Sequence, residues 1–238
     1  MKKVVFGLLI LMSFTVVSCL DDDDDDSYSL GDYWIGFGIL QEDDGETVFT
    51  MDDHSMLKPV SWGYNSGWDN EFTVGSRILV NYTILGDDKD ENGNVSTYYV
   101  KVNEIRKILK KGILDLTTEN ADSIGNDPIV VEDVWMTDSL LNFQLRYWGF
   151  QKVHYLNLVA NPDNVSTDEG VVKLELRHNA NMDETTYPYS AFVSFSLNEL
   201  RVEGLDSIKV EVMSTDYEDV SHIYKKVFDY SNLELPTP

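Results

Sequence analysis

Cysteine is almost absent from this chain, which has a single one, Cys19, in 238 residues. The body of the protein after that position therefore has no disulfide, no cysteine-based metal site and no thiol nucleophile. Basic residues are also scarce, with 18 Lys and Arg against 42 Asp and Glu and a formal net charge of −24. An acidic surface of this strength repels phosphate groups, which excludes nucleic acid as a general partner.

Motifs for catalysis and for cofactors are lacking as well. The histidines are scattered and form no short-range pair of zinc ligands: His54, His154, His178 and His222. No Gly-x-Ser-x-Gly elbow occurs, and 42 acidic residues offer so many carboxylate pairs that none of them indicates glycoside hydrolysis. We therefore predict a protein without a cofactor and with a binding role rather than an enzymatic one.

The first residues follow the pattern of a secretory signal. Met1–Lys3 is a basic head, Val4–Val17 is an apolar run, and small residues precede Cys19. The run is too short to span a bilayer stably, and no later segment reaches 18 apolar residues. The ending Val-Val-Ser-Cys resembles the lipobox of bacterial lipoproteins. This resemblance implies that residues 1–18 are removed and that Cys19 holds the protein on the outer membrane through its lipid anchor.

Residues 19–32 are expected to form an acidic tether. Asp21–Asp26 are six consecutive aspartates, and their mutual repulsion favours an extended chain. An acidic run just after the lipidated cysteine also resembles the surface-export signal of Bacteroidetes lipoproteins, which implies exposure at the cell surface. A solvated linker explains the same residues, so both interpretations stand. Removal of Lys2 and Lys3 with the signal changes the formal charge from −24 to −26.

Residues 33–111 predict a small β-barrel. Aromatic and β-branched residues dominate Tyr33–Leu40 and Thr47–Met51, and a third short strand is expected at Met56–Val60. Arg77–Leu85 is the clearest strand of this half, and Thr97–Ile105 is expected to pair with it as a hairpin. About five short strands within roughly 80 residues are typical of a small closed barrel.

Residues 112–232 predict a β-sandwich. Six or seven candidate strands follow one another at turn-bounded intervals, and Leu174–Arg177 and Phe192–Leu197 alternate apolar and polar residues. Just before this domain, Ile105, Ile108 and Leu109 have helical spacing, so residues 104–111 are either one helical turn or the end of a strand. The predicted fold is all-β, with an N-terminal OB-like barrel followed by a C-terminal sandwich.

Several stretches resemble the NigD-like lipoproteins of Bacteroidetes, which pair an OB-type barrel with a β-sandwich. The matching stretches are the following: Ser18-Cys19-Leu20 with its aspartates, residues 28–36, residues 75–82, Lys101-Val102-Asn103, Asp127-Pro128-Ile129, Trp135 and Leu140-Leu141-Asn142-Phe143. The resemblance spans nearly all of the mature chain. It implies a bacteriocin-related or immunity role and carries no catalytic residue onto this sequence.

One loop is a candidate calcium site. Asp88, Asp90 and Asn92 place oxygen ligands at alternate positions, and Gly93 follows them as in the first half of a calcium-binding loop. The twelfth position is Tyr99 where a bidentate Glu is needed, and the flanking segments are predicted strands. A hairpin turn made of Asp, Asn and Gly explains these residues without a metal.

Aromatic residues offer a candidate ligand surface. Trp62, Tyr64 and Trp68 lie in one loop, where exposed rings could stack on the apolar faces of sugars. The commoner role for such rings is to fill the end of a barrel or the boundary between domains. Both interpretations are kept at this stage.

Two further patterns concern the surface. Ser123, Ser139 and Ser207 each stand between an Asp and an Ile or Leu, which resembles the O-glycosylation pattern of exported Bacteroidetes proteins. A basic group lies within eleven positions and either contacts an acidic surface or neutralises its neighbours: Lys101, Arg106, Lys107, Lys110 and Lys111.

The sequence thus predicts a monomeric, lipid-anchored binding or interaction module of the cell envelope, with a possible link to bacteriocin immunity. Its protein or glycan partner is not identified by any motif. The alternatives are a structural subunit of a surface assembly and a protein that binds or acts on glycans. Exposed edge strands would favour the assembly.

Overall fold

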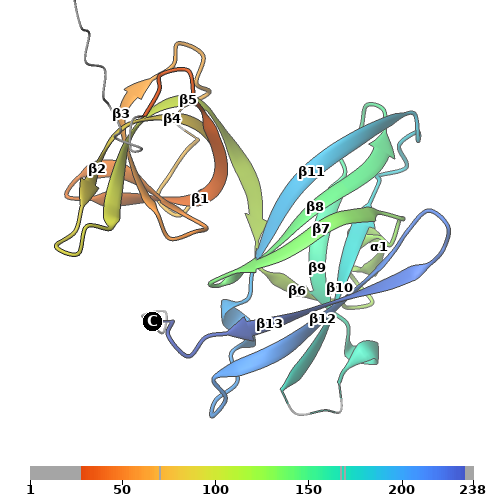
Figure 1. Cartoon of the computed structure of the whole chain (residues 1–238). Helices are drawn as coiled ribbons and strands as arrows, with labels where there is room; N and C mark the ends of the chain where they lie inside the picture. The colour runs from red at the N-terminus through yellow and green to blue at the C-terminus, as the bar shows by residue number, and fades with distance from the viewer. Residues whose placement is uncertain (1–27, 70, 167, 169, 234–238) are drawn as a thin grey trace, which may run out of the picture.

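The structure is a computed structural model that describes residues 28–233 except positions 70, 167 and 169 (Figure 1). The predicted signal at residues 1–18, the lipidation site Cys19 and the Asp21–Asp26 run lie outside the described residues. Tyr28, at the end of the predicted tether, packs edge-on against Tyr98 of the first domain. Within the described part of the chain, no helix has the length and apolar character needed to cross a membrane.

The first domain is a closed barrel of five strands. They are β1 (Trp34–Asp43), β2 (Glu46–Met51), β3 (Met56–Trp62), β4 (Arg77–Lys89) and β5 (Val95–Lys111). Antiparallel pairing runs in the order β3-β2-β1-β4-β5, and a parallel pairing of β3 with β5 closes the cylinder. Side chains that alternate along these strands fill the interior: Phe49, Leu57, Ile78, Val80, Val100 and Val102.

The second domain is a β-sandwich. One layer contains β7 (Val130–Thr137), β8 (Leu140–Gly149) and β11 (Tyr187–Ser196). The other layer has the order β13-β12-β10-β9-β6, with β6 (Ile113–Asp115), β9 (Tyr155–Ala160), β10 (Val171–Asn179), β12 (Ser207–Thr215) and β13 (Ser221–Asp229). The short helix α1 (Ala121–Ile124) and two single 3₁₀ turns, Pro162–Asn164 and Asn198–Leu200, lie in the connections.

The sandwich core forms where inward-facing side chains of both layers meet. Phe143 and Phe195 of one layer pack edge-on, with ring centroids 6.0 Å apart. Leu158, Val210 and Phe228 of the other layer belong to the same buried cluster. Burial of these side chains stabilises the domain without any disulfide, by roughly 1.5–3 kcal/mol for each large apolar side chain.

Strand β5 joins the two domains. Its first part belongs to the barrel, while Leu109–Lys111 pair in parallel with Val193–Phe195 of β11. One eight-stranded sheet therefore runs from the barrel into the sandwich, and the long β5 ribbon crosses between them (Figure 1). The domains are connected by a continuous sheet rather than by a flexible linker.

The predicted fold class is confirmed, and three details of the sequence analysis are resolved or corrected. Residues 104–111 are strand, not a helical turn, because β5 passes from the barrel into the sandwich there. Ile105 lies in the barrel core while Leu109 is half exposed, so the helix-like spacing reflects a change of neighbours along one strand. The β4–β5 hairpin is longer than expected, and the three-residue strand β6 was not anticipated.

Candidate binding cleft between the two domains

Arg77 lies at the junction of the two domains. It is the first residue of β4, and Ile78 and Val80 of the same strand point into the barrel core. Since side chains alternate along a strand, Arg77 points out of the barrel toward the sandwich. Its side chain is completely buried, which is rare for arginine unless it is paired.

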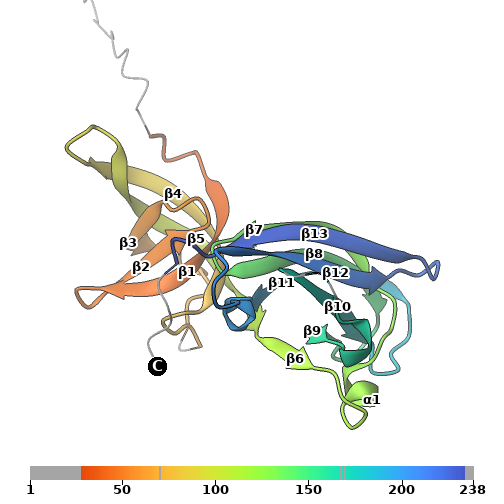
Figure 2. The same cartoon turned by 90° about the horizontal axis from the view of Figure 1, so that it is seen from below.

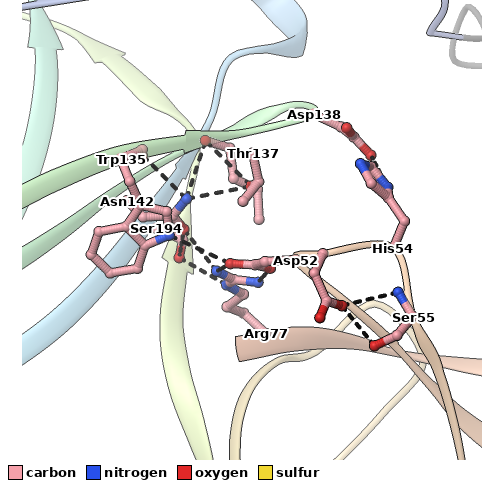
Figure 3. Close-up of polar contacts among 11 residues, drawn as sticks. Asp52, His54, Ser55, Arg77, Trp135, Thr137, Asp138, Asn142 and Ser194 are labelled. Carbon is pink, nitrogen blue, oxygen red and sulfur yellow. Dashed lines mark hydrogen bonds and ion pairs between the residues drawn. The ribbon is translucent and has the colours of Figure 1, made fainter. Parts of the chain in front are cut away.

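Asp52 of the barrel neutralises this buried guanidinium. Both carboxylate oxygens accept hydrogen bonds from Arg77, one of them from Nη2 at 2.6 Å, in a bidentate pair (Figure 3). Asp52 follows the end of β2, and its backbone N–H donates to the carbonyl of Phe37. The turn therefore holds the carboxylate in place on the barrel side.

The sandwich supplies the remaining acceptors for Arg77. Nε donates to Ser194 Oγ at 3.2 Å, and Nη2 donates to Asn142 Oδ1 at 3.1 Å (Figure 3). Ser194 Oγ in turn donates to Asn142 Oδ1 at 2.6 Å, while the Asn142 amide donates to carbonyl and hydroxyl oxygens of residues 135–140. One arginine thus bridges β4 of the barrel to β8 and β11 of the sandwich.

Aromatic rings shield this polar network. Phe37 lies 5.2 Å from Trp135 and 5.0 Å from Phe192, measured between ring centroids. The Arg77 guanidinium lies over the Phe37 ring at 5.3 Å, within the range of a cation–π contact. Trp135 Nε1 also donates to Asp52 at 3.4 Å. These contacts exclude water and hold the relative position of the domains.

A cleft opens beside this network, between barrel and sandwich. It has a volume of about 360 Å³ and is lined by residues of both domains: Ile39, Gln41, Thr50, Met51, Asp52, Arg77, Lys110, Thr137, Asp138, Ser139, Leu140, Ser196 and Asn198. Most of these side chains carry hydrogen-bonding groups. Partial desolvation and the nearby Arg77 charge lower the pKa of Lys110. The arrangement suits recognition of a polar segment, and boundaries between domains are common places for ligands.

The β5 lysines at this junction are engaged with the protein itself. Lys107 and Lys110 donate to the carbonyls of Glu71 and Gly75, and Lys111 donates to the Leu156 carbonyl and the Asn157 side chain of the sandwich. Arg106 pairs with Glu104 on the same strand. Of the two roles considered for the basic group, local contacts account for three of its members, Arg106, Lys107 and Lys110, and Lys111 contacts the other domain.

The candidate calcium residues lie in the β4–β5 hairpin and have other partners. Asp90 Oδ1 accepts the backbone N–H groups of Asn92 and Asn94, each at 2.8 Å, and these bonds lower the pKa of Asp90. Asp88 accepts a hydrogen bond from Tyr99. Among the described residues, no three His, Cys, Asp or Glu side chains converge in a way that could hold a metal ion.

The candidate aromatic residues fall into two groups. Trp62 and Trp68 have ring centroids 4.7 Å apart, and Trp68 stacks on Phe72 at 5.1 Å. Trp62 also packs edge-on against Phe49, which belongs to the barrel core. Tyr64 is fully exposed. The two tryptophans thus extend the barrel core to the surface, where both keep about a third of their area exposed.

The candidate glycosylation serines occupy three different settings. Ser123 lies in α1, where its hydroxyl donates to the Asn120 carbonyl. Ser207 is exposed at the start of β12. Ser139, in the β7–β8 turn, lines the interdomain cleft. The modification stays a prediction at all three.

The structure brings together two histidines that the sequence analysis treated as scattered. His154 Nδ1 lies 2.8 Å from His178 Nε2, and His154 Nε2 lies 3.2 Å from Asp183 Oδ2. Tyr147 packs against both imidazoles. No local signal in the sequence marks this group, because His178 and Asp183 are 24 and 29 residues away from His154. The arrangement of β9, β10 and the turn after β10 brings the three side chains together.

Hydrogen-bond roles along this chain can be assigned from its ends. The Pro128 carbonyl only accepts, so His178 Nδ1 donates to it at 2.9 Å, and burial lowers the pKa of His178. His178 Nε2 then accepts from His154, whose other nitrogen faces the Asp183 carboxylate. The backbone N–H of Phe150 and its neighbours lower the pKa of Asp183 well below its usual range.

Comparison with known families identifies the second half of the chain. Residues 112–225 match the family of the NigD-like C-terminal beta sandwich domain. The sandwich is similar to the NigD-like C-terminal domain. The resemblance to NigD-like proteins inferred from the sequence is thereby confirmed. A search of curated proteins gives no significant match.

Solved structures with the same fold extend over both domains. A protein of unknown function from Bacteroides vulgatus is 24% identical with a TM-score of 0.68, covering 87% of this chain and 95% of its own. A protein described as toxin related, from Parabacteroides distasonis, is 26% identical with a TM-score of 0.67, covering 84% and 94%. A NigD-like immunity protein from Bacteroides caccae is 18% identical with a TM-score of 0.63, covering 85% and 100%. The barrel and the NigD-like domain thus occur together in other chains.

Proposed function

We propose that this protein is a non-enzymatic binding module of the cell envelope that protects its host against a bacteriocin. The observation that carries the proposal is the interdomain cleft, whose two walls are fixed to each other by the Arg77 network. A preformed concave site needs little reorganisation on binding, so less free energy is lost to ordering. The descriptions of two neighbours, one toxin related and one an immunity protein, favour a bacteriocin as the partner.

The cleft suggests how such a partner would be recognised. Gln41 of the barrel and Asp138, Ser139 and Asn198 of the sandwich surround it with donors and acceptors. A polar loop of the bacteriocin could satisfy these groups from both domains at once. Specificity would come from the hydrogen bonds, because a mismatched loop leaves polar groups desolvated and unpaired.

The proposal places the protein on the outer membrane as a monomer anchored through lipidated Cys19. Support comes from the signal and lipobox pattern of residues 1–19. Several acyl chains on one cysteine would give durable attachment. Anchoring keeps the binding cleft where an incoming bacteriocin must pass.

Survival of bacteria tests this function. The gene is expressed in a bacteriocin-sensitive Bacteroides strain, and survival is measured against a panel of purified bacteriocins. Wild type should protect against at least one of them. Ser139→Trp, which fills the mouth of the cleft, and Cys19→Ala, which removes the anchor, should both abolish that protection.

The control is Ser221→Trp, an exposed position in the β12–β13 hairpin at the end of the sandwich away from the barrel (Figure 1). This variant should protect as well as wild type. Full protection by Ser139→Trp would exclude the cleft as the binding site. Absence of protection by wild type against every bacteriocin in the panel would argue against the immunity role.

A second candidate function is glycan binding at the end of the barrel. Trp62 and Trp68, each about a third exposed, line a cavity of about 500 Å³ together with Lys58 and Glu46. Partly exposed indole rings next to charged groups are typical of sugar-binding surfaces. A glycan array with wild type and Trp68→Ala tests it: signals that wild type alone gives would favour this alternative.

A further inference from the structure

The outer face of the five-stranded sheet carries an unusual group of lysines. β10, β12 and β13 lie side by side there (Figure 2). Lys173 of β10 and Lys225 of β13 are both paired in register with Glu211 of β12. Lys209 stands two residues before Glu211 on the same face. Three ammonium groups therefore surround one carboxylate, on a chain whose formal net charge is −24.

Only part of this positive charge is neutralised within the protein. Lys225 Nζ forms an ion pair with Glu211 at 2.6 Å. Neither Lys173 nor Lys209 has a side-chain hydrogen bond or ion pair with any described residue. The nearby lysines lower the pKa of Glu211, with the hydrogen bond from Lys225 as the largest cause. Lys107, Lys110 and Lys111 of β5 differ, because their ammonium groups are bound to carbonyl oxygens.

A groove gives these lysines the shape of a binding site. It has a volume of about 630 Å³ and is lined by Val165, Ser166, Asp168, Val171, Lys173, Lys209, Glu211, Lys225, Lys226 and Val227. Four of the chain's 18 basic residues thus face one groove. Val165 and Ser166 form one wall and come directly after the 3₁₀ turn at Pro162–Asn164. Hydrogen bonds from the side chains of Asn161 and Asn164 to the buried Glu175 hold this turn in place.

The floor of the groove alternates charged and apolar side chains. Lys209 is flanked in register by Val171 and Val227, and the row with Lys173 and Lys225 lies next to it. Val165 and Val227 are 70% and 58% exposed, so apolar surface remains open to a ligand. The lining has no aromatic ring on which a sugar could stack and no arginine fork for phosphate.

We propose that this groove binds an extended acidic segment of a protein partner, in which every second side chain faces the sheet and these facing side chains are carboxylate and aliphatic in turn. The carboxylates would contact Lys173, Lys209 and Lys225, and the aliphatic side chains would cover Val171 and Val227. In an extended segment every second side chain faces the sheet. This spacing matches the two residues that separate the row of Lys209 from the row of Lys173 and Lys225 along the strands. This surface lies apart from the interdomain cleft, and its role does not depend on bacteriocin immunity.

A peptide-binding experiment tests the proposal. The probe is a fluorescent ten-residue peptide in which Glu and Val alternate at every second position with Ser between them, and its anisotropy is measured with the purified protein at low and physiological salt. Binding should weaken as salt rises, because exposed charges are screened. The double variant Lys173→Gln, Lys209→Gln should weaken binding about tenfold, as expected for the loss of two exposed charge contacts.

The matched control is Lys101→Gln, Arg106→Gln, which removes the same charge from exposed positions of β5. This control variant should bind the peptide as wild type does. A peptide in which Gln replaces Glu should not bind to the wild-type protein. Equal weakening by both double variants would mean that only net charge matters and would overturn the proposal. So would the absence of peptide binding, or binding of the acidic polysaccharide hyaluronate in its place. Because the bacteriocin assay probes the cleft, either proposal can fail while the other holds.

Discussion

The two ends of the sandwich both bury charged side chains, but with different chemistry. At the barrel end, Arg77 and Asp52 form a pair between domains, and Asn142 near the start of β8 completes it. At the other end, Asp183 and His154 form a network within one domain, next to Tyr147 near the end of β8. Arginine is charged over the whole physiological pH range, whereas burial lowers the pKa of His178 from its ordinary value.

This difference separates two roles. The barrel-end network holds one relative position of the domains over the whole range of physiological pH. The network at the far end fixes a loop, because Asp183 accepts the backbone N–H groups of Phe150, Gln151 and Lys152. Substitutions at the first network should affect the whole molecule, and substitutions at the second should remain local and depend on pH.

The largest effect is expected from Arg77→Met. The substitution removes the guanidinium that donates to both Asp52 oxygens and to Asn142 Oδ1, and it leaves the partly buried Asp52 carboxylate without its counter-charge. Loss of one partner of a buried ion pair costs about 3–5 kcal/mol of unfolding free energy. Urea unfolding, followed by tryptophan fluorescence and circular dichroism, measures it.

Arg106→Met is the control, since Arg106 is an exposed arginine whose pair with Glu104 is also exposed. Its effect should stay below about 1 kcal/mol. If Arg77→Met were no more destabilising than Arg106→Met, the network would not hold the domains together. Addition of Asp52→Leu to Arg77→Met should recover part of the loss, because the unpaired charge is removed.

Asp183→Asn should have a smaller and more local effect. An amide is a weaker acceptor than a carboxylate for the three N–H groups of the loop. The melting temperature should fall by several degrees, and amide exchange should become faster at residues 150–152 while the Phe143 and Phe195 core keeps its protection.

Asp206→Asn controls for the loss of one negative charge at an exposed position of the same domain. It should leave both the melting temperature and the exchange at residues 150–152 unchanged. Faster exchange throughout the sandwich in Asp183→Asn would show that the network supports the whole domain and would remove the contrast with Arg77.

The sequence allowed the strands to be predicted but not these networks, and the reason is physical. Alternation in stretches such as Leu174–Arg177 is a local property, and it identified nearly every strand of the sandwich. The partners of Arg77 are 25, 65 and 117 residues away, and no pattern within one strand records them. The sequence did show an arginine, Arg77, at the start of an apolar strand, but it did not show that this side chain is buried.

The pH dependence of stability should come from the far end of the sandwich. His178 has a lowered pKa because it is buried, so the unfolded chain takes up a proton at a higher pH than the folded protein does. Its contribution is complete above the unfolded value near 6.5 and is lost as pH falls toward the lowered value. Asp183 also has a lowered pKa, but its contribution is lost only below the unfolded value near 4.

Urea midpoints at pH 7.5, 6.5 and 5.5 measure this slope. Wild type should lose up to about 1.4 kcal/mol for each pH unit in the lower part of this range, the limit for uptake of one proton. His178→Gln should be less stable overall but have a flatter slope. His54→Gln, at an exposed histidine, should keep the wild-type slope. An unchanged slope in His178→Gln would assign the pH dependence to another group.

The smallest effect is expected at an exposed pair of the same chemical type. His222 Nε2 lies 2.7 Å from Asp216 Oδ2, which is closer than the 3.2 Å between His154 Nε2 and Asp183 Oδ2. Distance alone would rank the surface pair as the stronger. Water, however, screens His222, whose side chain is 44% exposed against 2% for His154.

His222→Gln should therefore change the melting temperature much less than Asp183→Asn does, and the small change should disappear in 0.5 M salt. Thermal unfolding of both variants at low and high salt makes the comparison. Asp216 would keep its bonds from the backbone N–H groups of Glu218 and Val220, so the β12–β13 hairpin should stay folded. Equal losses of stability in His222→Gln and Asp183→Asn would show that burial does not decide the strength of these two His–Asp pairs.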